Sequence, residues 1–252
     1  MTTRPISGTR VNLVIMELTR RTLLGRRRTV LLSLLPAVLL LLAVVRRFDA
    51  TAGPAHTSGF IQDFALGTWL PLVCLLIGTG VIAPEIEDGS IVYMLAKPIR
   101  RSTTAVSKLV VAVGAATIFG VIPIALACLI AGDENGALAA SFGAAAALSM
   151  LAYISLFFML AIYSRNAVTI GLIYALLWES LLGNSVPGAR SVSIHQWALA
   201  IGEKMLTWHA PEWSVSSAVG LTAGLVMLTL TIIVTVTFSI RKLSALHLRT
   251  GE

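Results

Sequence analysis

The sequence predicts an all-α, polytopic membrane protein, and three observations lead to this fold class. Hydrophobic residues make up 56% of the chain and charged residues only 12%, whereas about a quarter of the residues in a soluble domain are charged. The apolar residues form long runs of the length that a membrane-spanning helix needs. These runs are continuous, whereas the strands of a transmembrane barrel alternate between apolar and polar residues. We therefore expect the 252 residues to form a single membrane-embedded domain, 1–252.

The first predicted element is an amphipathic helix over residues 9–28. Its apolar residues recur at helical spacing beside a basic stripe: Val11, Val14, Ile15 and Leu18. Such a helix lies in the interface, here on the inner membrane face. The alternative is a twin-arginine export signal at residues 19–24, cleaved near residues 50–52. The Leu-rich run that follows ends in Arg46 and Arg47 and precedes further apolar runs, which favours the interfacial helix.

Six apolar runs come next, each near the about 20 residues that a membrane span requires. They cover residues 29–45, 60–83, 104–131, 137–163, 167–183 and 214–240. Pro123 is expected to kink the third span. Between the fifth and sixth spans, residues 184–213 contain Trp197, Trp208 and Trp213. Because Trp prefers the membrane interface, this stretch predicts short re-entrant or interfacial helices on the outer side.

Lysine and arginine residues predict the orientation of these spans. Six spans place both termini on one side, and fifteen of the 19 Lys and Arg residues then lie on that side. The positive-inside rule makes it the cytoplasm. The Leu, Ala and Arg bias suggests a bacterial cytoplasmic (inner) membrane. The net charge of +7 then indicates cytoplasmic loops and membrane lipids as partners, and we expect no nucleic acid.

A charged block at residues 85–108 lies between the second and third spans, and lipid excludes it. Three acidic residues open the block: Glu85, Glu87 and Asp88. Gly89 permits a turn, and Ser90 can cap a short helix over residues 91–96. The helix ends at Lys97 and Pro98, because proline cannot continue a helix.

The short helix has an apolar face of Tyr93, Met94 and Leu95, and Arg100 and Arg101 anchor the return at the headgroups. Residues 84–103 would then form a helix parallel to the membrane between two spans. A force on such a segment would tilt both spans. The alternative is an ordinary solvated loop that satisfies the positive-inside rule.

The residue order in this block resembles the cytoplasmic loop of the ABC type 2 permeases, the membrane subunits of a class of ATP-driven exporters. Their pattern is an acidic pair, Gly and Ser or Thr, an apolar helix, Pro, Arg, and Lys at the next span. The matching residues are Glu85, Glu87, Gly89, Ser90, Leu95, Pro98, Arg101 and Lys108. The amphipathic first helix, six spans, internal termini and short outer helices extend the likeness over nearly the whole chain.

The resemblance implies that the block is a coupling helix fitting a groove on a separate ATPase subunit. The residues implied to enter the groove are Ile91, Met94 and Leu95, and those implied to make polar contacts beside it are Glu85, Glu87 and Asp88. Arg100 and Arg101 would position the helix. The implied partners are two copies of a cytosolic ABC ATPase and a second permease subunit, identical or similar, with which this chain forms the translocation path.

We expect no enzymatic activity of the chain itself. It has no GxxxxGK[ST] phosphate loop, so ATP and Mg would be bound by the partner subunit and this chain would bind no cofactor. The direction of transport expected from the resemblance is export. Ala, Gly, Thr and aliphatic residues would line the path, which favours an amphipathic or apolar cargo such as a drug, lipid or peptide.

Trp178 and Glu179 form the second candidate site, because Glu179 is the only acid well inside an apolar run. An ionised side chain near the bilayer centre costs about 2.5–3.5 kcal/mol, so Glu179 should face protein or water. Some permeases of the resembled family carry a Trp-Glu pair here, which favours a role at the outer gate, in the path, or in holding the short outer helices. The alternative is a helix-end acid that reaches water, since Gly183 and Pro187 follow closely.

Two other functions remain open at this point: a non-transporting assembly or anchoring subunit, and an intramembrane metalloenzyme using the acidic residues of the charged block. We expect no metal site, because the four histidines lie at span ends or in loops: His56, His195, His209 and His247. Cys74 and Cys128 lie inside apolar runs and are expected in the core. Gly220 and Gly224 form a GxxxG pattern that predicts close helix packing, within the subunit or between subunits.

Overall fold

The computed structural model describes residues 13–23, 25–48, 54–87, 101–132, 135–183, 187–210, 213 and 215–245, and all regular structure in these ranges is helical. The elements are α1 (Leu13–Leu23), α2 (Arg26–Arg47), α3 (Pro54–Phe60), η1 (Ile61–Trp69), α4 (Leu70–Gly80), α5 (Ala83–Glu87), α7 (Arg101–Ala116), η2 (Thr117–Val121), α8 (Ile122–Ile130), α9 (Ala137–Tyr163), α10 (Ala167–Ile173), η3 (Tyr174–Leu182), α12 (Pro187–Arg190), α13 (Ile194–His209) and α14 (Leu221–Ala245). The predicted all-α class is confirmed for the part of the chain that these ranges cover.

Five helices in the described ranges are long and apolar enough to cross a membrane. They are Thr29–Arg47, His56–Glu85, Ser102–Ile130, Ala137–Tyr163 and Leu221–Leu243. The fifth expected span is a shorter apolar helix, Ala167–Leu182. At about 1.5 Å per residue its 16 residues extend about 24 Å, less than the hydrocarbon core of about 30 Å. The membrane-embedded class is therefore supported by five helices, and the sixth crossing stays a prediction.

Burial separates a central pair of helices from three peripheral ones. The His56–Glu85 and Ala137–Tyr163 helices are 78% and 67% buried over their most apolar windows, against 17%, 28% and 22% for the helices containing α2, α7 and α14. The exposed side chains on the peripheral helices are mostly large and apolar, including Leu34 on α2, Ile118 on η2 and Ile233 on α14. Since lipid tails are as apolar as these side chains, such faces suit a bilayer.

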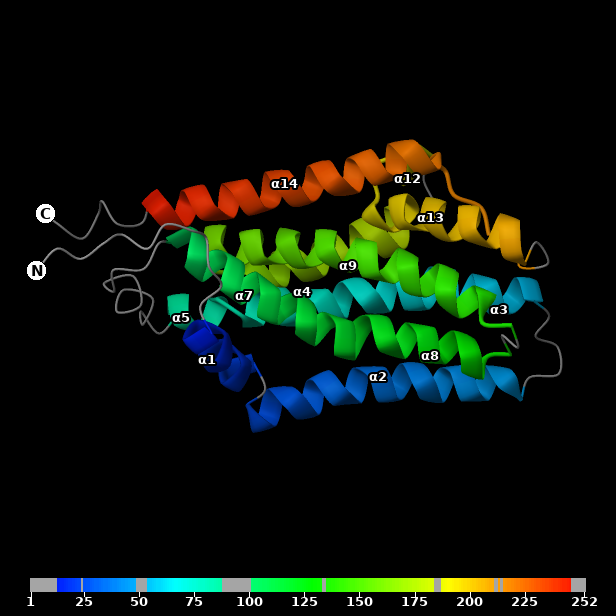
Figure 1. The fold of residues 1–252 in the computed structure, drawn as a ribbon, viewed down its shortest axis with the longest axis horizontal. Coiled ribbons are helices and arrows are strands. Elements are labelled where there is room, and N and C mark those ends of the chain that lie inside the picture. Colours follow the sequence, from blue (N-terminus) through cyan, green and yellow to red (C-terminus); the bar gives the residue numbers. More distant parts are fainter. Residues whose placement is uncertain are drawn as a thin grey trace, which may run out of the picture.

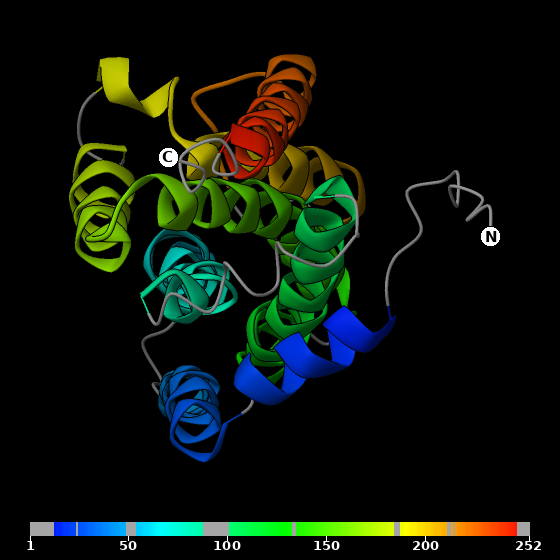
Figure 2. The ribbon, with the colours of Figure 1, turned by 90° about the vertical axis from the view of Figure 1, so that its left-hand side faces the viewer.

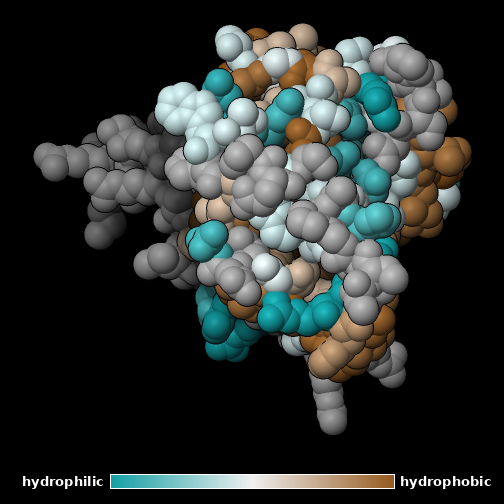
Figure 3. All heavy atoms as spheres, turned by 90° about the vertical axis from the view of Figure 1, so that its right-hand side faces the viewer, coloured by the Kyte–Doolittle hydropathy of each residue, from teal (hydrophilic) through white to brown (hydrophobic). Residues whose placement is uncertain are grey.

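The helices run roughly along one axis, and different elements lie at the two ends of the bundle (Figure 1). At one end lie α1, α5, the start of α7 and the end of α14; at the other lie α3, the end of α8 and α13. Hydrophilic side chains are frequent on the latter end, and hydrophobic ones gather on its flanks (Figure 3). The charged block therefore leaves and re-enters the bundle at the end where α1 begins the described chain and α14 finishes it.

Helix α1 is shorter than the predicted amphipathic helix. It ends at Leu23, and α2 begins at Arg26 after Gly25 adopts an extended backbone, so the expected end at residue 28 is wrong; residues 9–12 lie outside the described ranges. Ile15 is buried, whereas Leu18 is 59% exposed and does not join the buried face. Figure 2 shows α1, in dark blue, lying across α7 near the end of the bundle.

Two of the three π-helical segments in the described chain end two residues before a proline. Pro71 has no N–H for the carbonyl of Gly67, and the backbone adopts the wider π register, in which Leu70 N–H donates to the Ala65 carbonyl. The Gly67 carbonyl instead accepts a hydrogen bond from the Ser180 hydroxyl at 3.4 Å. Pro123 follows η2 in the same way, and the kink expected at Pro123 stays a prediction.

The stretch between η3 and α14 contains the helices α12 and α13; their predicted re-entrant or interfacial position stays a prediction. Helix α12 is a single turn, and α13 packs against α9 and α14. Trp208 is exposed and carries Lys204 over its ring at 5.6 Å, whereas Trp197 is buried and its indole donates to the Ser191 carbonyl at 2.8 Å. Trp197 therefore packs inside the protein, and its position at a membrane interface stays a prediction.

Candidate functional site

Most of the predicted coupling segment lies outside the described residues. Those positions are Asp88, Gly89, Ser90, Ile91, Met94, Leu95, Pro98 and Arg100. The structure describes the backbone of Glu87 at the end of α5 and of Arg101 at the start of α7. The coupling helix itself stays a prediction, and the structure describes only the two ends of the block, at α5 and α7.

A buried ion pair joins the two ends of the block. Lys108 is 0% exposed, and its Nζ donates to Glu85 Oε1 at 2.6 Å and to the Val81 carbonyl at 2.9 Å. Val81 directly follows α4, so the ammonium also lies at the negative end of that helix. The two charged residues are 23 positions apart in the sequence, and their contact holds the end of α5 against α7.

The energetics of burial favour an ion pair between Glu85 and Lys108 that stays intact. Removing one partner of a buried ion pair costs about 3–5 kcal/mol, because the other charge is left without compensation. Lys108 has the carboxylate and the carbonyl to satisfy it, so opening the pair exposes both groups to an apolar surrounding. The sequence placed Glu85 at an interface with the ATPase; within the chain its carboxylate contacts Lys108 instead, and that interface role is untested.

The second candidate site surrounds Glu179, which is 0% exposed. Its Oε1 accepts from the Tyr174 hydroxyl at 2.7 Å and from Ile194 N–H at 3.1 Å. Its Oε2 accepts from the Ser193 hydroxyl at 2.6 Å and from His195 N–H at 3.2 Å. The alternative that Glu179 reaches water at a helix end is therefore wrong, since four protein donors enclose it.

The geometry makes Glu179 a cap on a neighbouring helix. Ser193 is the N-cap residue of α13, and Ile194 and His195 carry the first free N–H groups of that helix. A carboxylate is an acceptor-only group, and helix N-termini stabilise negative charge. The carboxylate of η3 thus fixes the position of α13. Trp178 beside it is half-buried; nothing in the described geometry tests a role for it in a gate or path.

His195 extends this cluster toward η1. Its ring is buried, and Nε2 lies 3.0 Å from the Gln62 carbonyl oxygen. Because a carbonyl only accepts, we assign the proton to Nε2. Burial lowers the pKa of His195, while Glu179, Asp63 and the Gln62 carbonyl oppose that shift. Nδ1 has no hydrogen-bond partner among the described residues, which suits a neutral ring.

Further contacts connect α13 to the remaining helices around it. The Gln196 side chain accepts from Ala218 N–H at 3.1 Å, and the Glu203 carboxylate accepts from Ser217 N–H at 2.9 Å. On the other side, the Thr68 hydroxyl of η1 donates to Ser180 of η3 at 3.0 Å. Helix α13 is thereby attached to η3 at its start and to the segment that leads into α14.

Sequence reasoning missed the residues that complete this cluster. Ser193 and Gln196 have the Ser-x-x-Gln spacing of a capping box, and the Ser193 hydroxyl accepts from Gln196 N–H at 3.4 Å; that signal locates the start of α13. His195 was weighed only as a metal ligand. The described residues contain no group of three or more His, Cys, Asp or Glu that could hold a metal ion.

Comparisons with protein-family models and with curated proteins found no match to the chain. The two sites are therefore interpreted from their own contacts.

Proposed function

We propose that the chain is the membrane-spanning subunit of an ATP-binding-cassette exporter, which forms the translocation path as a dimer and is coupled through its first cytoplasmic loop to a separate ATPase. The observation that carries the proposal is the buried ion pair between Glu85 and Lys108. Both residues belong to the residue pattern of the coupling loop. Their contact supports a loop whose two ends move together.

The ion pair would transmit a force on the loop to the helices of the bundle. Helix α4 packs against the central helix α9, and α7 contacts both α4 and α9. A force on residues 88–100 would therefore reach α4 and α7 through this ion pair. ATP binding on the partner subunits would supply that force, and tilting of these helices would open the path between two copies. The pair thus converts a push on one loop into a shared movement of two spans.

The first experiment tests the attachment of the ATPase. The tagged chain is co-expressed with each cytosolic ABC ATPase of its own genome in turn, and the ATPase that binds is recovered through the tag. Glu87→Lys with Asp88→Lys should reduce the recovered ATPase at least tenfold, because both charges at the expected interface are reversed. Arg165→Glu is the matched control, since Arg165 is an exposed charge in the α9–α10 connection at the same end.

The outcome separates the proposal from its alternatives. Full recovery of the ATPase with the double variant would refute coupling through this loop. If the ATPase is recovered with the unchanged chain and yet no amphipathic cargo stimulates ATP hydrolysis in proteoliposomes, the chain is an anchoring subunit and the export proposal fails. Stimulation by cargo that the double variant abolishes is the expected result.

A further inference from the structure

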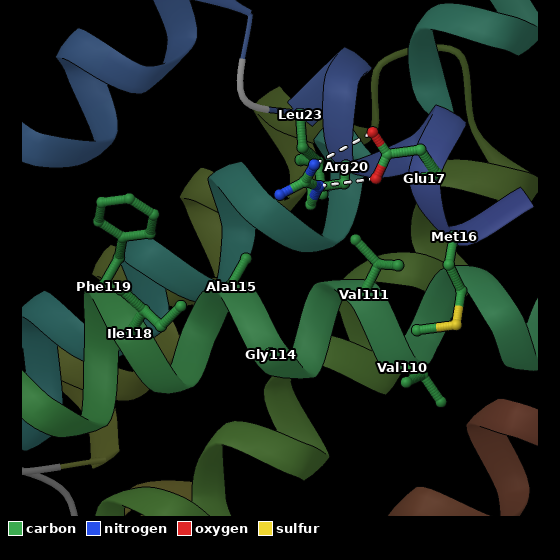
Figure 4. Close-up of a pocket in the computed structure, with 10 residues that line it drawn as sticks. All are labelled: Met16, Glu17, Arg20, Leu23, Val110, Val111, Gly114, Ala115, Ile118 and Phe119. Carbon is green, nitrogen blue, oxygen red and sulfur yellow. Dashed lines mark hydrogen bonds and ion pairs between the residues drawn. The ribbon is translucent and has the colours of Figure 1, made fainter. Parts of the chain in front are cut away.

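A groove of about 680 Å³ lies between α1 and α7, outside both sites described above. Figure 4 shows α7 along its floor and side chains of α1 above it. The apolar lining includes Met16, Leu23, Val110, Gly114, Ile118 and Phe119. This volume lies within the range of about 300–1,000 Å³ that is usual for small-molecule sites. The groove is open at the surface, so a ligand can enter it from the bilayer.

Glu17 and Arg20 of α1 line the groove, and Arg21 lies next to this lining through its contact with Glu17. Arg20 donates to both oxygens of Glu17 at 3.0 Å, and Arg21 donates to Glu17 Oε1 at 2.8 Å. These hydrogen bonds lower the pKa of Glu17 to about 2, so the carboxylate is ionised at neutral pH. Two guanidinium groups against one carboxylate leave one net positive charge. All three side chains are largely exposed, so the guanidinium groups remain accessible.

The groove has a charged side on α1 and an apolar floor along α7 (Figure 4). Arg20 lies on α1 above the floor that α7 forms (Figure 4). From Val110 to Phe119 the floor runs about 13 Å toward the middle of the bundle, at about 1.5 Å per residue. Halfway along it, a Cβ added at Gly114 would meet no atom within 4 Å, so this part of the groove is open space.

We propose that this groove binds one anionic phospholipid, with its phosphate at Arg20 and Arg21 and one acyl chain along α7. The charged side and the apolar floor match the headgroup and the acyl chain of a phospholipid. Juxtamembrane arginines attract anionic headgroups, and arginine pairs with phosphate through two parallel hydrogen bonds. A zwitterionic lipid lacks the net charge that complements the charged side. An apolar helix of a second copy would leave both guanidinium groups without an anion other than Glu17.

The experiment uses the full chain in lipid nanodiscs with a photoactivatable acyl chain on phosphatidylglycerol or on phosphatidylcholine, and the labelled peptides are identified by mass spectrometry. We expect phosphatidylglycerol to label α1 and residues 110–119 several-fold more than phosphatidylcholine does. Arg20→Gln with Arg21→Gln should lower that labelling several-fold by removing the charge. Gly114→Leu should lower it equally by filling the groove, since nothing there opposes a side chain.

Gly59→Leu is the control for the groove-filling change. Gly59 lies in α3 at the opposite end and also has no atom within 4 Å of an added Cβ, so labelling should stay unchanged. Thermal unfolding of each variant confirms that it is folded. Equal labelling by the two lipids, or labelling unaffected by Gly114→Leu, would overturn the proposal. Gly114→Cys that cross-links two copies efficiently would overturn it too, because a second copy would then occupy the groove.

Discussion

Glu179 shows how a single carboxyl side chain can be held inside an apolar protein. Each carboxylate oxygen accepts two hydrogen bonds, and two of the four donors are backbone N–H groups at the start of α13. Backbone N–H groups cannot turn away or become acceptors. The requirement for two oxygens at this position is therefore strict, and a side chain of the same size with one oxygen should not satisfy it.

Glu179→Gln tests that requirement. The amide NH₂ would face donors that it cannot satisfy, and leaving buried donors unpaired costs about 1–3 kcal/mol. We expect a clear fall in the midpoint of thermal unfolding in detergent. Ser193→Ala is the comparison, because losing an N-cap side chain alone costs about 1 kcal/mol. A Gln variant as stable as the unchanged chain would show that the carboxylate charge has no structural role here.

His195 predicts a dependence of stability on pH. Its pKa is lowered in the folded state because the ring is buried, so the unfolded chain binds a proton that the folded chain excludes. Stability from this residue is complete above the usual histidine pKa of about 6.5 and is lost as pH falls below it. Asp63 and Glu179 face the ring and limit the loss.

The measurement is the midpoint of thermal unfolding at pH 7.5 and pH 5.5. His195→Gln should make the difference between these two values smaller, because glutamine does not titrate. His56→Gln is the control, since His56 is exposed on α3 and should leave the difference unchanged. An identical pH response in the unchanged chain and the His195 variant would refute the assignment.

Gly224 explains how closely α14 approaches α13. A Cβ added at Gly224 would lie 2.8 Å from the Trp197 carbonyl oxygen, whereas one at Gly220 would meet nothing within 4 Å. Of the GxxxG pair, Gly224 therefore serves packing within the subunit, and Gly220 makes no such close contact. The contact is with backbone, which cannot give way as a flexible side chain can.

Gly224→Ala should separate α13 from α14 and lower the midpoint of thermal unfolding, while Gly220→Ala should have little effect. Gly224 lies inside α14, where helix propensity favours alanine over glycine, so a lower midpoint for Gly224→Ala cannot come from propensity. Equal effects of the two alanines would contradict the close contact.

The sequence predicted the helices well and their mutual contacts poorly. Apolar length located the helices containing α2, α4, α9 and α14, because lipid leaves helices as the main way to satisfy the backbone. Periodicity could not show that η1 and η3 are π-helical. The π register of η1 is linked to Pro71, and the hydrogen bond between η1 and η3 joins segments that are far apart in the sequence. The partner of Lys108 was equally hidden, because a pair 23 residues apart becomes visible only when the spans are packed.

At the scale of the whole molecule, the ion pair between Glu85 and Lys108 decides whether a force on the loop between α5 and α7 moves the helices of the bundle. Under the proposed function, Glu85→Gln with Lys108→Met removes both charges together. Replacing a buried pair by apolar or neutral groups is often nearly neutral for stability, unlike removing one partner. The double variant should therefore fold and retain the ATPase while its transport falls at least tenfold in proteoliposomes. Transport at the original rate would show that coupling does not depend on this ion pair.

The enclosed carboxylate of Glu179 also has a consequence for the order of synthesis. Three of its four donors lie at residues 193–195, which leave the ribosome after the helix that carries the acid. Until residues 193–195 have been synthesised, the segment 167–182 carries an acidic side chain without these donors, which hydrocarbon disfavours. The segment is also shorter than the hydrocarbon core of a bilayer. Stable insertion of this segment should therefore wait for the following helix, so that chains truncated before residue 193 would leave it in the translocon or at the bilayer surface.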